Sequence, residues 1–424
     1  MALGFYIILA AQFLSALADN ALLFAAIALL KDINAPAWFT PVLQDAFVIS
    51  YIVLAPFVGA FADSIPKGRV MFISNNIKIV GCLAMLFGVN PLIAYGIAGF
   101  GAAAYSPAKY GILTEYLPPD KLVKANSWME GLTVLAIILG AIVGGVLVNP
   151  HIAQPLLQLW DVPYIDTGID TAPQLAIAII SGIYVVAALF NLYIPRVAVD
   201  HKPLSRNPVF LLKDFWRCFR LLWKDPLGQV SLAVTSLFWG AGSVLRLLVL
   251  GWATYALGYD LSSGTQLTAW VAVGIAIGAV LAARFVKLEH AVKVLPMGIG
   301  MGLMVLVMIP VKIPFLAILL LLSIGMMAGY FVVPMNALLQ HRGHVLMGAG
   351  HSIAVQNFNE NIGILVMVGL YAVMIHQGVS VNRAVVLFGL CMSGAMLLVM
   401  WRHQYNQSKG DSLHLITDDG EHKH

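Results

Sequence analysis

Charged residues are scarce in this chain. Only 10% of its 424 residues are Asp, Glu, Lys or Arg, and 60% are hydrophobic, whereas an ordinary soluble domain has about 25% charged residues. The composition excludes such a domain and indicates an integral membrane protein. The small net charge of +4 gives no sign of a nucleic-acid partner, because loop cations in a membrane protein follow its orientation.

Cysteine and enzyme motifs are also rare. Cys82, Cys218 and Cys391 are scattered over two apolar runs and a loop, which favours free thiols over disulfides or a metal site. No Gly-Lys-Ser/Thr loop is present to cradle phosphate, and the run GIGMG at 298–302 lacks the strand that a dinucleotide site requires. We therefore expect no metal, no cofactor and no enzymatic activity.

Long apolar runs make up most of the sequence. Twelve of them can cross a bilayer as helices of about 20 residues, and a bilayer has no water to satisfy a backbone that is not helical. The first run lacks the basic start of a cleaved signal peptide, so we expect it to be retained. The predicted spans are residues 4–31, 40–62, 70–89, 91–113, 126–149, 174–195, 228–257, 264–286, 292–310, 314–340, 349–376 and 380–402.

A basic segment divides the spans into two sets of six. Residues 196–227 contain seven Lys and Arg within a Leu/Phe/Trp pattern, which predicts a cytoplasmic linker with an interfacial helix. Its cations would meet anionic headgroups or, alternatively, dock a partner. The fold class expected is an all-α membrane protein with twelve transmembrane helices in two pseudo-symmetric six-helix bundles, at 1–195 and 228–403, followed by a polar cytoplasmic tail at 404–424.

The distribution of cations predicts the orientation of the chain. Eighteen of the 24 Lys and Arg residues fall in loops, tails or span ends on one side of the predicted membrane, and only Lys31, Lys312 and Arg383 fall on the other. Because cytoplasmic loops carry the excess of Lys and Arg, both termini are expected in the cytoplasm.

Two opposite charges lie inside spans at matching positions of the two halves. Asp19 is in the first span, and Arg246 follows 227 residues later, in the first span of the second half. The same offset relates Pro107 to Pro334. A charge in the hydrocarbon is costly unless it faces a partner or a water-filled cavity. The pair therefore predicts a transport site; the alternatives are a structural ion pair that joins the halves, or a pair that alternates between both roles.

Other polar residues share helix faces with these charges. Residues three or four apart lie on one face of a helix, which places Gln12 and Ser15 beside Asp19. By the same spacing Thr235, Trp239 and Gly242 lie beside Arg246. Both faces are expected to line a central cavity. The predicted substrate-binding residues of these and nearby segments are Asp19, Arg246, Gln12, Ser15, Asn20, Trp239 and Tyr105.

The eleventh predicted span opens with a dense polar run that could not face lipid. Gln356 and Glu360 lie on one of its faces and are predicted either to contact a headgroup or cation, or to form a helix-packing network of buried amides. Lys109 and Glu130, nearer the cytoplasmic ends of their spans, are assigned gating or packing roles. Lys78 is assigned a gating or packing role in the same way, and packing is favoured.

The loop GAFADSIPKGR at 59–69 resembles the signature loop of the major facilitator superfamily. The resemblance implies that Asp63, with Lys67 and Arg69, acts as a gate that latches the two halves on the cytoplasmic side. The alternative is a tight loop whose cations only follow the positive-inside rule.

Longer segments of both halves resemble the bacterial lysophospholipid transporter family of that superfamily. They are AQFLSALADNALLFAAIALLK, GAAAYSPAKYGIL, KLVKAN, SLFWGAGSVLR and AVQNFNEN. This resemblance implies facilitated uptake of lysophosphatidylethanolamine from the outer to the inner leaflet of a Gram-negative inner membrane. Reacylation by a cytoplasmic acyltransferase/acyl-carrier-protein synthetase would follow, as part of phospholipid remodelling.

The charged residues suit such a substrate. The planar guanidinium group of Arg246 offers N–H donors whose arrangement matches phosphate oxygens, and Asp19 could hold an ammonium group. The small-residue runs at Gly101 and Gly140 predict close helix packing or room for an acyl chain. The alternatives are a cation-coupled exporter of amphipathic small molecules and, from other classes, a membrane-embedded acyltransferase or a scaffold that acts through the linker.

Overall fold

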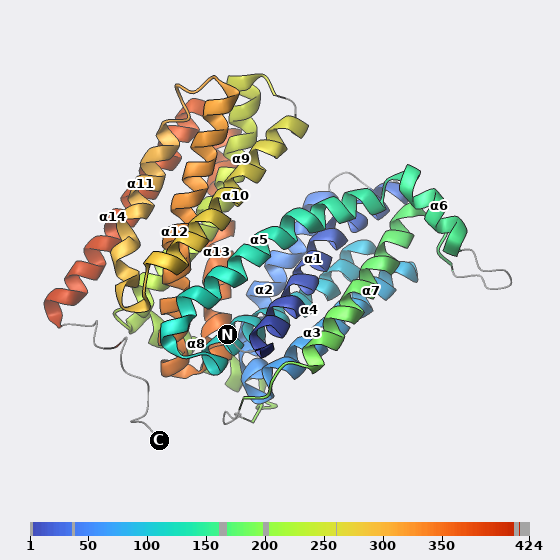
Figure 1. Cartoon of the computed structure of the whole chain (residues 1–424), viewed down its shortest axis with the longest axis horizontal. Helices are drawn as coiled ribbons and strands as arrows, with labels where there is room; N and C mark the ends of the chain where they lie inside the picture. Colours follow the sequence, from blue (N-terminus) through green and yellow to red (C-terminus); the bar gives the residue numbers. More distant parts are fainter. Residues whose placement is uncertain are drawn as a thin grey trace. The chain divides into compact units, whose positions relative to one another are not determined.

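The computed structural model describes residues 3–35, 39–160, 168–197, 203–259, 261–410 and 415. Within these ranges the chain is helical and contains no strand (Figure 1). Two 3-10 helices, η1 (Pro119–Lys121) and η2 (Leu288–Val294), accompany the α-helices. The α-helices are α1 (Leu3–Asp32), α2 (Phe39–Ser64), α3 (Lys67–Leu86), α4 (Pro91–Tyr116), α5 (Leu122–Leu147), α6 (Pro150–Trp160), α7 (Ala172–Leu192), α8 (Pro208–Lys224), α9 (Gly228–Leu257), α10 (Leu261–Phe285), α11 (Leu295–Leu306), α12 (Pro314–Met347), α13 (Ala349–His376) and α14 (Val381–Lys409).

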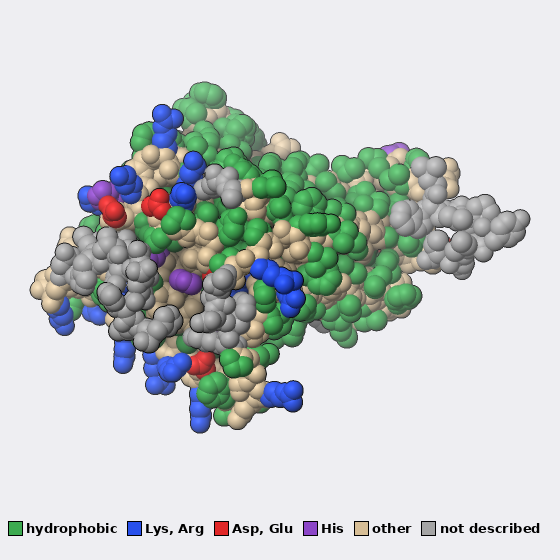
Figure 2. All heavy atoms as spheres, turned by 60° about the horizontal axis from the view of Figure 1, so that its bottom comes forward, with side chains coloured by type: hydrophobic (Ala, Val, Ile, Leu, Met, Phe, Trp, Pro, Cys, Tyr) green, Lys and Arg blue, Asp and Glu red, His purple; other side chains and the backbone are tan. Residues whose placement is uncertain are grey.

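These helices have the length and composition of membrane spans, which confirms the predicted all-α fold. Eleven segments among the described residues are long and apolar enough to cross a membrane. The remaining predicted span, the fourth at 91–113, corresponds to α4, which is 26 residues long but is less apolar because of its Gly, Ala and Tyr residues. Hydrophobic side chains cover much of the face in Figure 2, and large ones such as Val80, Leu189 and Leu398 are exposed. In a membrane protein such residues contact lipid.

Several helix boundaries differ from the predicted spans. The ninth span, expected at 292–310, begins as η2 and becomes α-helical only at Leu295, where Pro296 occupies the first turn. Proline is favoured there because its missing N–H would have no partner anyway. In contrast, α12 continues to Met347 rather than 340, and α14 reaches Lys409, inside the segment predicted as a polar tail.

Two helices lie between the spans. The sequence analysis did not predict α6, an 11-residue helix after α5. Helix α8 lies inside the predicted linker and is amphipathic: Leu211, Phe215, Cys218 and Leu222 are buried, and the cations of the helix are exposed. This spacing gives one apolar stripe along the helix. The location of α8 at the membrane surface stays a prediction.

The helices group into two compact units. Unit 1 comprises residues 1–112 and 135–214, and unit 2 comprises residues 113–134 and 215–424. Within unit 1, α1 and α3 both pack against α7; within unit 2, α10 packs against α12, α9 against α13, and α11 against α14. The prediction had assigned residues 1–195 to one bundle, whereas the first part of α5 groups with unit 2. Helix α5 is continuous, so its two ends belong to different units.

Small residues bring α5 close to α1 within unit 1. A Cβ atom added at Gly140 would lie 2.6 Å from the carbonyl oxygen of Leu17, and one added at Gly144 would lie 2.7 Å from that of Ala21. Real Cβ atoms do not approach backbone this closely, so α1 would have to move. The run GAIVGG therefore serves close helix packing, as one of its two interpretations predicted.

Replacing Gly144 by Val is expected to lower the free energy of unfolding by about 1–3 kcal/mol, because the added side chain overpacks the contact with α1. The matched control is Gly145→Val in the same helix turn, where an added Cβ meets nothing within 4 Å. Thermal unfolding of the purified protein in detergent measures both variants. Equal midpoints for the two would contradict the packing interpretation.

Candidate functional site

Asp19 is held by two side chains from other helices of unit 1. Lys78 Nζ lies 2.8 Å from Asp19 Oδ1 and 2.9 Å from Asp19 Oδ2, and the Tyr184 hydroxyl donates to Asp19 Oδ1 at 2.7 Å. The side chain of Lys78 has no exposed surface, whereas that of Asp19 is 23% exposed. The ion pair thus joins α1, α3 and α7, and the carboxylate alone keeps access to open space.

The remaining contacts of Lys78 complete a buried polar cluster. Its ammonium donates to the Ser15 hydroxyl at 2.9 Å, and Ser15 in turn donates to Asn75 Oδ1 at 2.8 Å. The ammonium also lies 4.7 Å and 5.4 Å from the ring centres of Tyr105 and Tyr184, within the range of cation–π attraction. A buried cation needs such partners to offset its loss of hydration.

A small cavity opens beside this cluster within unit 1. Five of the predicted residues line it together, namely Gln12, Ser15, Asp19, Tyr105 and Lys109. Tyr51, Ser106, Ala16 and Ala102 complete the wall. Lys109 had been assigned to a gate or to packing, but the structure places it in the same cavity as Asp19. The cavity thus combines a carboxylate, an ammonium group and several hydroxyl groups.

Asn20 lies elsewhere. Its amide donates to the carbonyl oxygen of Ala16 at 2.8 Å within α1. Its Cβ would lie 2.7 Å from a Cβ added at Gly140 of α5, so its side chain packs in the α1–α5 contact rather than lining the cavity. A substrate contact for Asn20 stays a prediction.

In unit 2, Arg246 and Trp239 lie on α9. Arg246 is exposed and Trp239 is partly exposed, and the nearby Gly242 is exposed as well. Among the described residues Arg246 has no ion pair. The sequence analysis had paired Asp19 with Arg246, but Asp19 already has a cationic partner in Lys78. That partner could have been suspected from one signal, a lysine in the middle of an apolar span.

Gln356 and Glu360 belong to a chain of hydrogen bonds in unit 2. Gln356 Nε2 donates to Glu360 Oε1 at 2.7 Å and to Asn336 Oδ1 at 3.0 Å. Asn336 Nδ2 in turn lies 3.5 Å from Glu130 Oε1. All four side chains are buried. This geometry matches the packing network named as the alternative, and the contact of these residues with substrate stays a prediction.

The first half of α5 makes two further contacts in unit 2. Asn126 and Gln340 exchange amide hydrogen bonds of 2.9 Å and 2.8 Å, and the Ser127 hydroxyl donates to the carbonyl oxygen of Ala279 at 2.6 Å. Both amides are buried, so each satisfies a group that would otherwise be costly. These contacts join α5 to α12 and α10.

The loop between α2 and α3 is closed by a local ion pair. Lys67 Nζ lies 2.8 Å from Asp63 Oδ1 and donates to the carbonyl oxygen of Ala62 at 2.7 Å. Asp63 and Lys67 are buried, whereas Arg69 is exposed. The pair ties the end of α2 to the start of α3. Its role as a gate stays a prediction.

One buried ion pair was missed from the sequence. Arg342 Nη2 lies 2.7 Å from Asp225 Oδ1, and both side chains are only 5% exposed. Asp225 also accepts a hydrogen bond from the N–H of Gly228, the first residue of α9. Arg342 had been counted as a loop cation because the tenth span was expected to end at 340; the buried partners allow α12 to continue through this polar segment.

Comparison with known proteins identifies the class. The chain belongs to the Major Facilitator Superfamily, whose sequence model matches residues 8–368. Solved transporters of low sequence identity share the fold. One is FucP in the outward conformation, with a TM-score of 0.68 and 13% identity over 95% of this chain and 99% of that one. Another is a bacterial homologue of the iron transporter ferroportin, with a TM-score of 0.71 and 16% identity over 96% and 100%.

Relatives of higher sequence identity identify the family within this superfamily. The chain is 46% identical over 369 residues to the lysophospholipid transporter LplT of Serratia proteamaculans (strain 568), covering 87% of each protein. It is 45% identical over 379 residues, 89% of each, to that of Yersinia enterocolitica. The chain therefore belongs to the bacterial lysophospholipid transporter family, which confirms the resemblance noted in its sequence. It is a multi-pass membrane transporter and not an enzyme.

Asp19→Asn is expected to lower the free energy of unfolding by about 3–5 kcal/mol, because it leaves the fully buried Lys78 without its negative partner. Lys78→Met is expected to cost less, since Asp19 is partly exposed. The double variant Asp19→Asn/Lys78→Met should be more stable than Asp19→Asn alone, because it leaves no buried charge without an opposite charge. Thermal unfolding of the purified proteins provides the measurement.

Asp32→Asn serves as the control, since Asp32 is an exposed acid at the end of the same helix and is expected to leave the midpoint nearly unchanged. If the double variant instead loses the sum of the two single losses, Asp19 and Lys78 are not energetically coupled.

Proposed function

We propose that this protein moves lysophospholipids across the bacterial inner membrane. The structural observation that carries the proposal is the cavity in unit 1, where the exposed edge of Asp19 and the side chain of Lys109 lie together. The names of the relatives, lysophospholipid transporters that match over nearly nine tenths of the chain, support the same substrate class. Charged groups inside a membrane protein typically mark such a pathway.

The chemistry of the cavity suits a zwitterionic headgroup. Lysophosphatidylethanolamine carries an ammonium group, which Asp19 would accept, and a phosphate, which Lys109 would bind as a compact charge. Arg246 on α9 is proposed to contact the phosphate during transport, since its guanidinium group matches phosphate oxygens. The single acyl chain needs only apolar surface, which the spans supply.

The direction and fate of the lipid complete the proposal. Both termini lie in the cytoplasm, as the excess of loop cations on one side favours, and lysophosphatidylethanolamine moves from the outer to the inner leaflet without a coupling ion. Asp63, Lys67 and Glu130 contribute to gating. A cytoplasmic acyltransferase/acyl-carrier-protein synthetase then reacylates the lipid.

Asp19→Ala and Arg246→Ala are each expected to slow uptake of labelled lysophosphatidylethanolamine by spheroplasts roughly 10-fold or more, because a hydrogen bond to a charged group contributes about 1.5–3 kcal/mol. Lys109→Gln should weaken uptake in the same direction. Rates are expressed per amount of folded transporter in the membrane, since loss of Asp19 also destabilises the protein.

Two variants control for loss of charge in general. Asp32→Asn removes an exposed acid from the end of α1, and Arg383→Ala removes an exposed arginine from α14; both should transport normally. Normal uptake by Arg246→Ala and Lys109→Gln would remove both cations from the substrate site, and normal uptake by Asp19→Ala would remove the carboxylate.

Collapse of the proton gradient with an uncoupler distinguishes facilitated movement from ion coupling. Uptake of lysophosphatidylethanolamine into vesicles should persist at a similar initial rate, because no step of the proposed cycle consumes the gradient. A large loss of initial rate would contradict facilitated movement and favour coupling through a carboxylate such as Asp19 or Glu360.

A further inference from the structure

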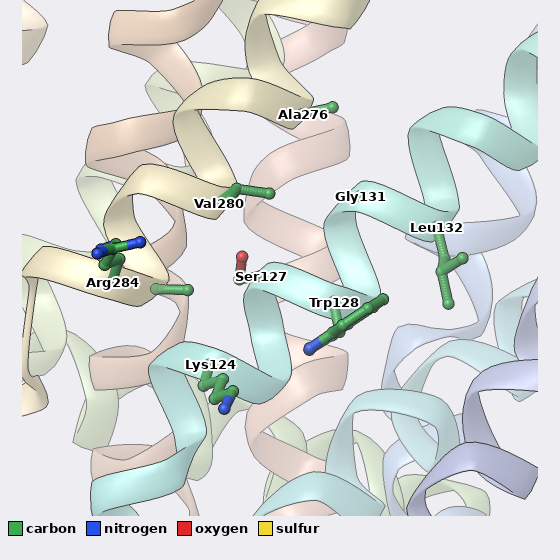
Figure 3. A pocket seen from close by; sticks show the side chains of 9 residues that line it. Lys124, Ser127, Trp128, Gly131, Leu132, Ala276, Val280 and Arg284 are labelled. Carbon is green, nitrogen blue, oxygen red and sulfur yellow. The ribbon is translucent and has the colours of Figure 1, made fainter.

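A second cavity lies in unit 2 and shares no lining residue with the cavity beside Asp19. It has a volume of about 420 Å³ and lies between the first half of α5 and the second half of α10 (Figure 3). Its size falls within the range of small-molecule sites, about 300–1,000 Å³. It is lined by Lys124, Ser127, Trp128, Gly131, Leu132, Ala276, Val280, Ala283 and Arg284.

The lining of this cavity combines cationic and apolar side chains. Lys124 and Arg284, both exposed, supply its charges, and the nine lining residues include no carboxylate. Ala276 lies at the end away from Lys124 in Figure 3. The hydroxyl of Ser127 is already bonded to the carbonyl oxygen of Ala279. The cavity therefore offers cations for a headgroup and an apolar wall for a hydrocarbon chain.

The position of the cations along the chain places them at a membrane surface. Lys124 is in the first turn of α5 and Arg284 is in the last turn of α10. In the proposed topology both helix ends face the cytoplasm, where the leaflet carries anionic lipids. Trp128, one turn after Lys124, is 48% exposed, and tryptophan is enriched at the level of the headgroups.

We propose that this cavity binds an anionic diacyl phospholipid of the cytoplasmic leaflet, of the phosphatidylglycerol class. Lys124 and Arg284 hold its phosphate, and one acyl chain lies along Leu132, Ala276 and Val280. A net negative lipid fits better than a zwitterionic one, because the lining has no carboxylate to receive an ammonium group. The bound lipid would stabilise the contact between α5 and α10 next to the Ser127–Ala279 hydrogen bond.

Native mass spectrometry of the full-length protein in detergent, titrated with dioleoyl phosphatidylglycerol, tests the headgroup contact. Lys124→Gln/Arg284→Gln should weaken the tightest binding event roughly 30-fold, given two cations lost near an anionic headgroup. The matched control Lys121→Gln/Lys287→Gln removes two exposed cations from the same surface that do not line the cavity, and should bind like the unaltered protein. Equal affinity of the two double variants would overturn the proposal.

A second pair of variants tests the acyl contact without changing charge. Val280→Trp fills the apolar wall and should abolish the tightest binding event. Ile277→Trp, on an exposed position of α10 outside the cavity, should not. Retained binding by Val280→Trp would mean that the lipid is held only by electrostatic attraction to the protein surface, and would overturn the proposal.

Competition identifies the occupant. Dioleoyl phosphatidylethanolamine and oleoyl-lysophosphatidylethanolamine are expected to displace phosphatidylglycerol poorly. Efficient displacement by the lysophospholipid would assign the cavity to the substrate path and would also overturn the proposal. Because binding is measured rather than transport, failure here is distinguishable from failure of the proposed function.

Discussion

A lysine without exposed surface in a membrane-spanning helix is the constraint on which unit 1 depends. Lys78 keeps its charge compatible with the hydrocarbon because Asp19 neutralises it, Ser15 accepts a hydrogen bond, and two tyrosine rings lie within cation–π distance. These partners come from α1, α4 and α7. One ion pair therefore fixes how four helices meet, and it leaves one edge of Asp19 directed at the cavity.

The buried polar groups of unit 2 also need partners, but their chemistry differs from that of the Asp19–Lys78 ion pair. There, uncharged amides carry much of the polar contact: Asn126 pairs with Gln340, and Asn336 links Glu130 to Gln356. Because these bonds hold the first half of α5 on α12, while Gly140 packs its second half on α1, a single helix contributes to the interior of both units. This explains why α5 does not follow the division into two sets of six spans.

The sequence predicted several residues that line the cavity in unit 1, but it did not predict that Asp19 pairs with Lys78. The spacing of Asp19, Gln12 and Ser15 placed them on one helix face, and in the structure all three line the same cavity. Lys78 was assigned a gating or packing role, although it is the cation that Asp19 contacts. Spacing along one helix gives the face of that helix; it says nothing about which neighbouring helix supplies the partner.

The sequence by itself determined the long apolar helices of this protein and its membrane class, because a long apolar run in a bilayer has no alternative to the helix. Tertiary structure alone decided which charges meet. A Cβ atom at Gly101 would lie 2.6 Å from the carbonyl oxygen of Ser74 and 2.7 Å from Lys78 Cγ. Only the close approach of α3 and α4 at this glycine brings Lys78 against Tyr105, and such an approach depends on the fit of two surfaces far apart in sequence.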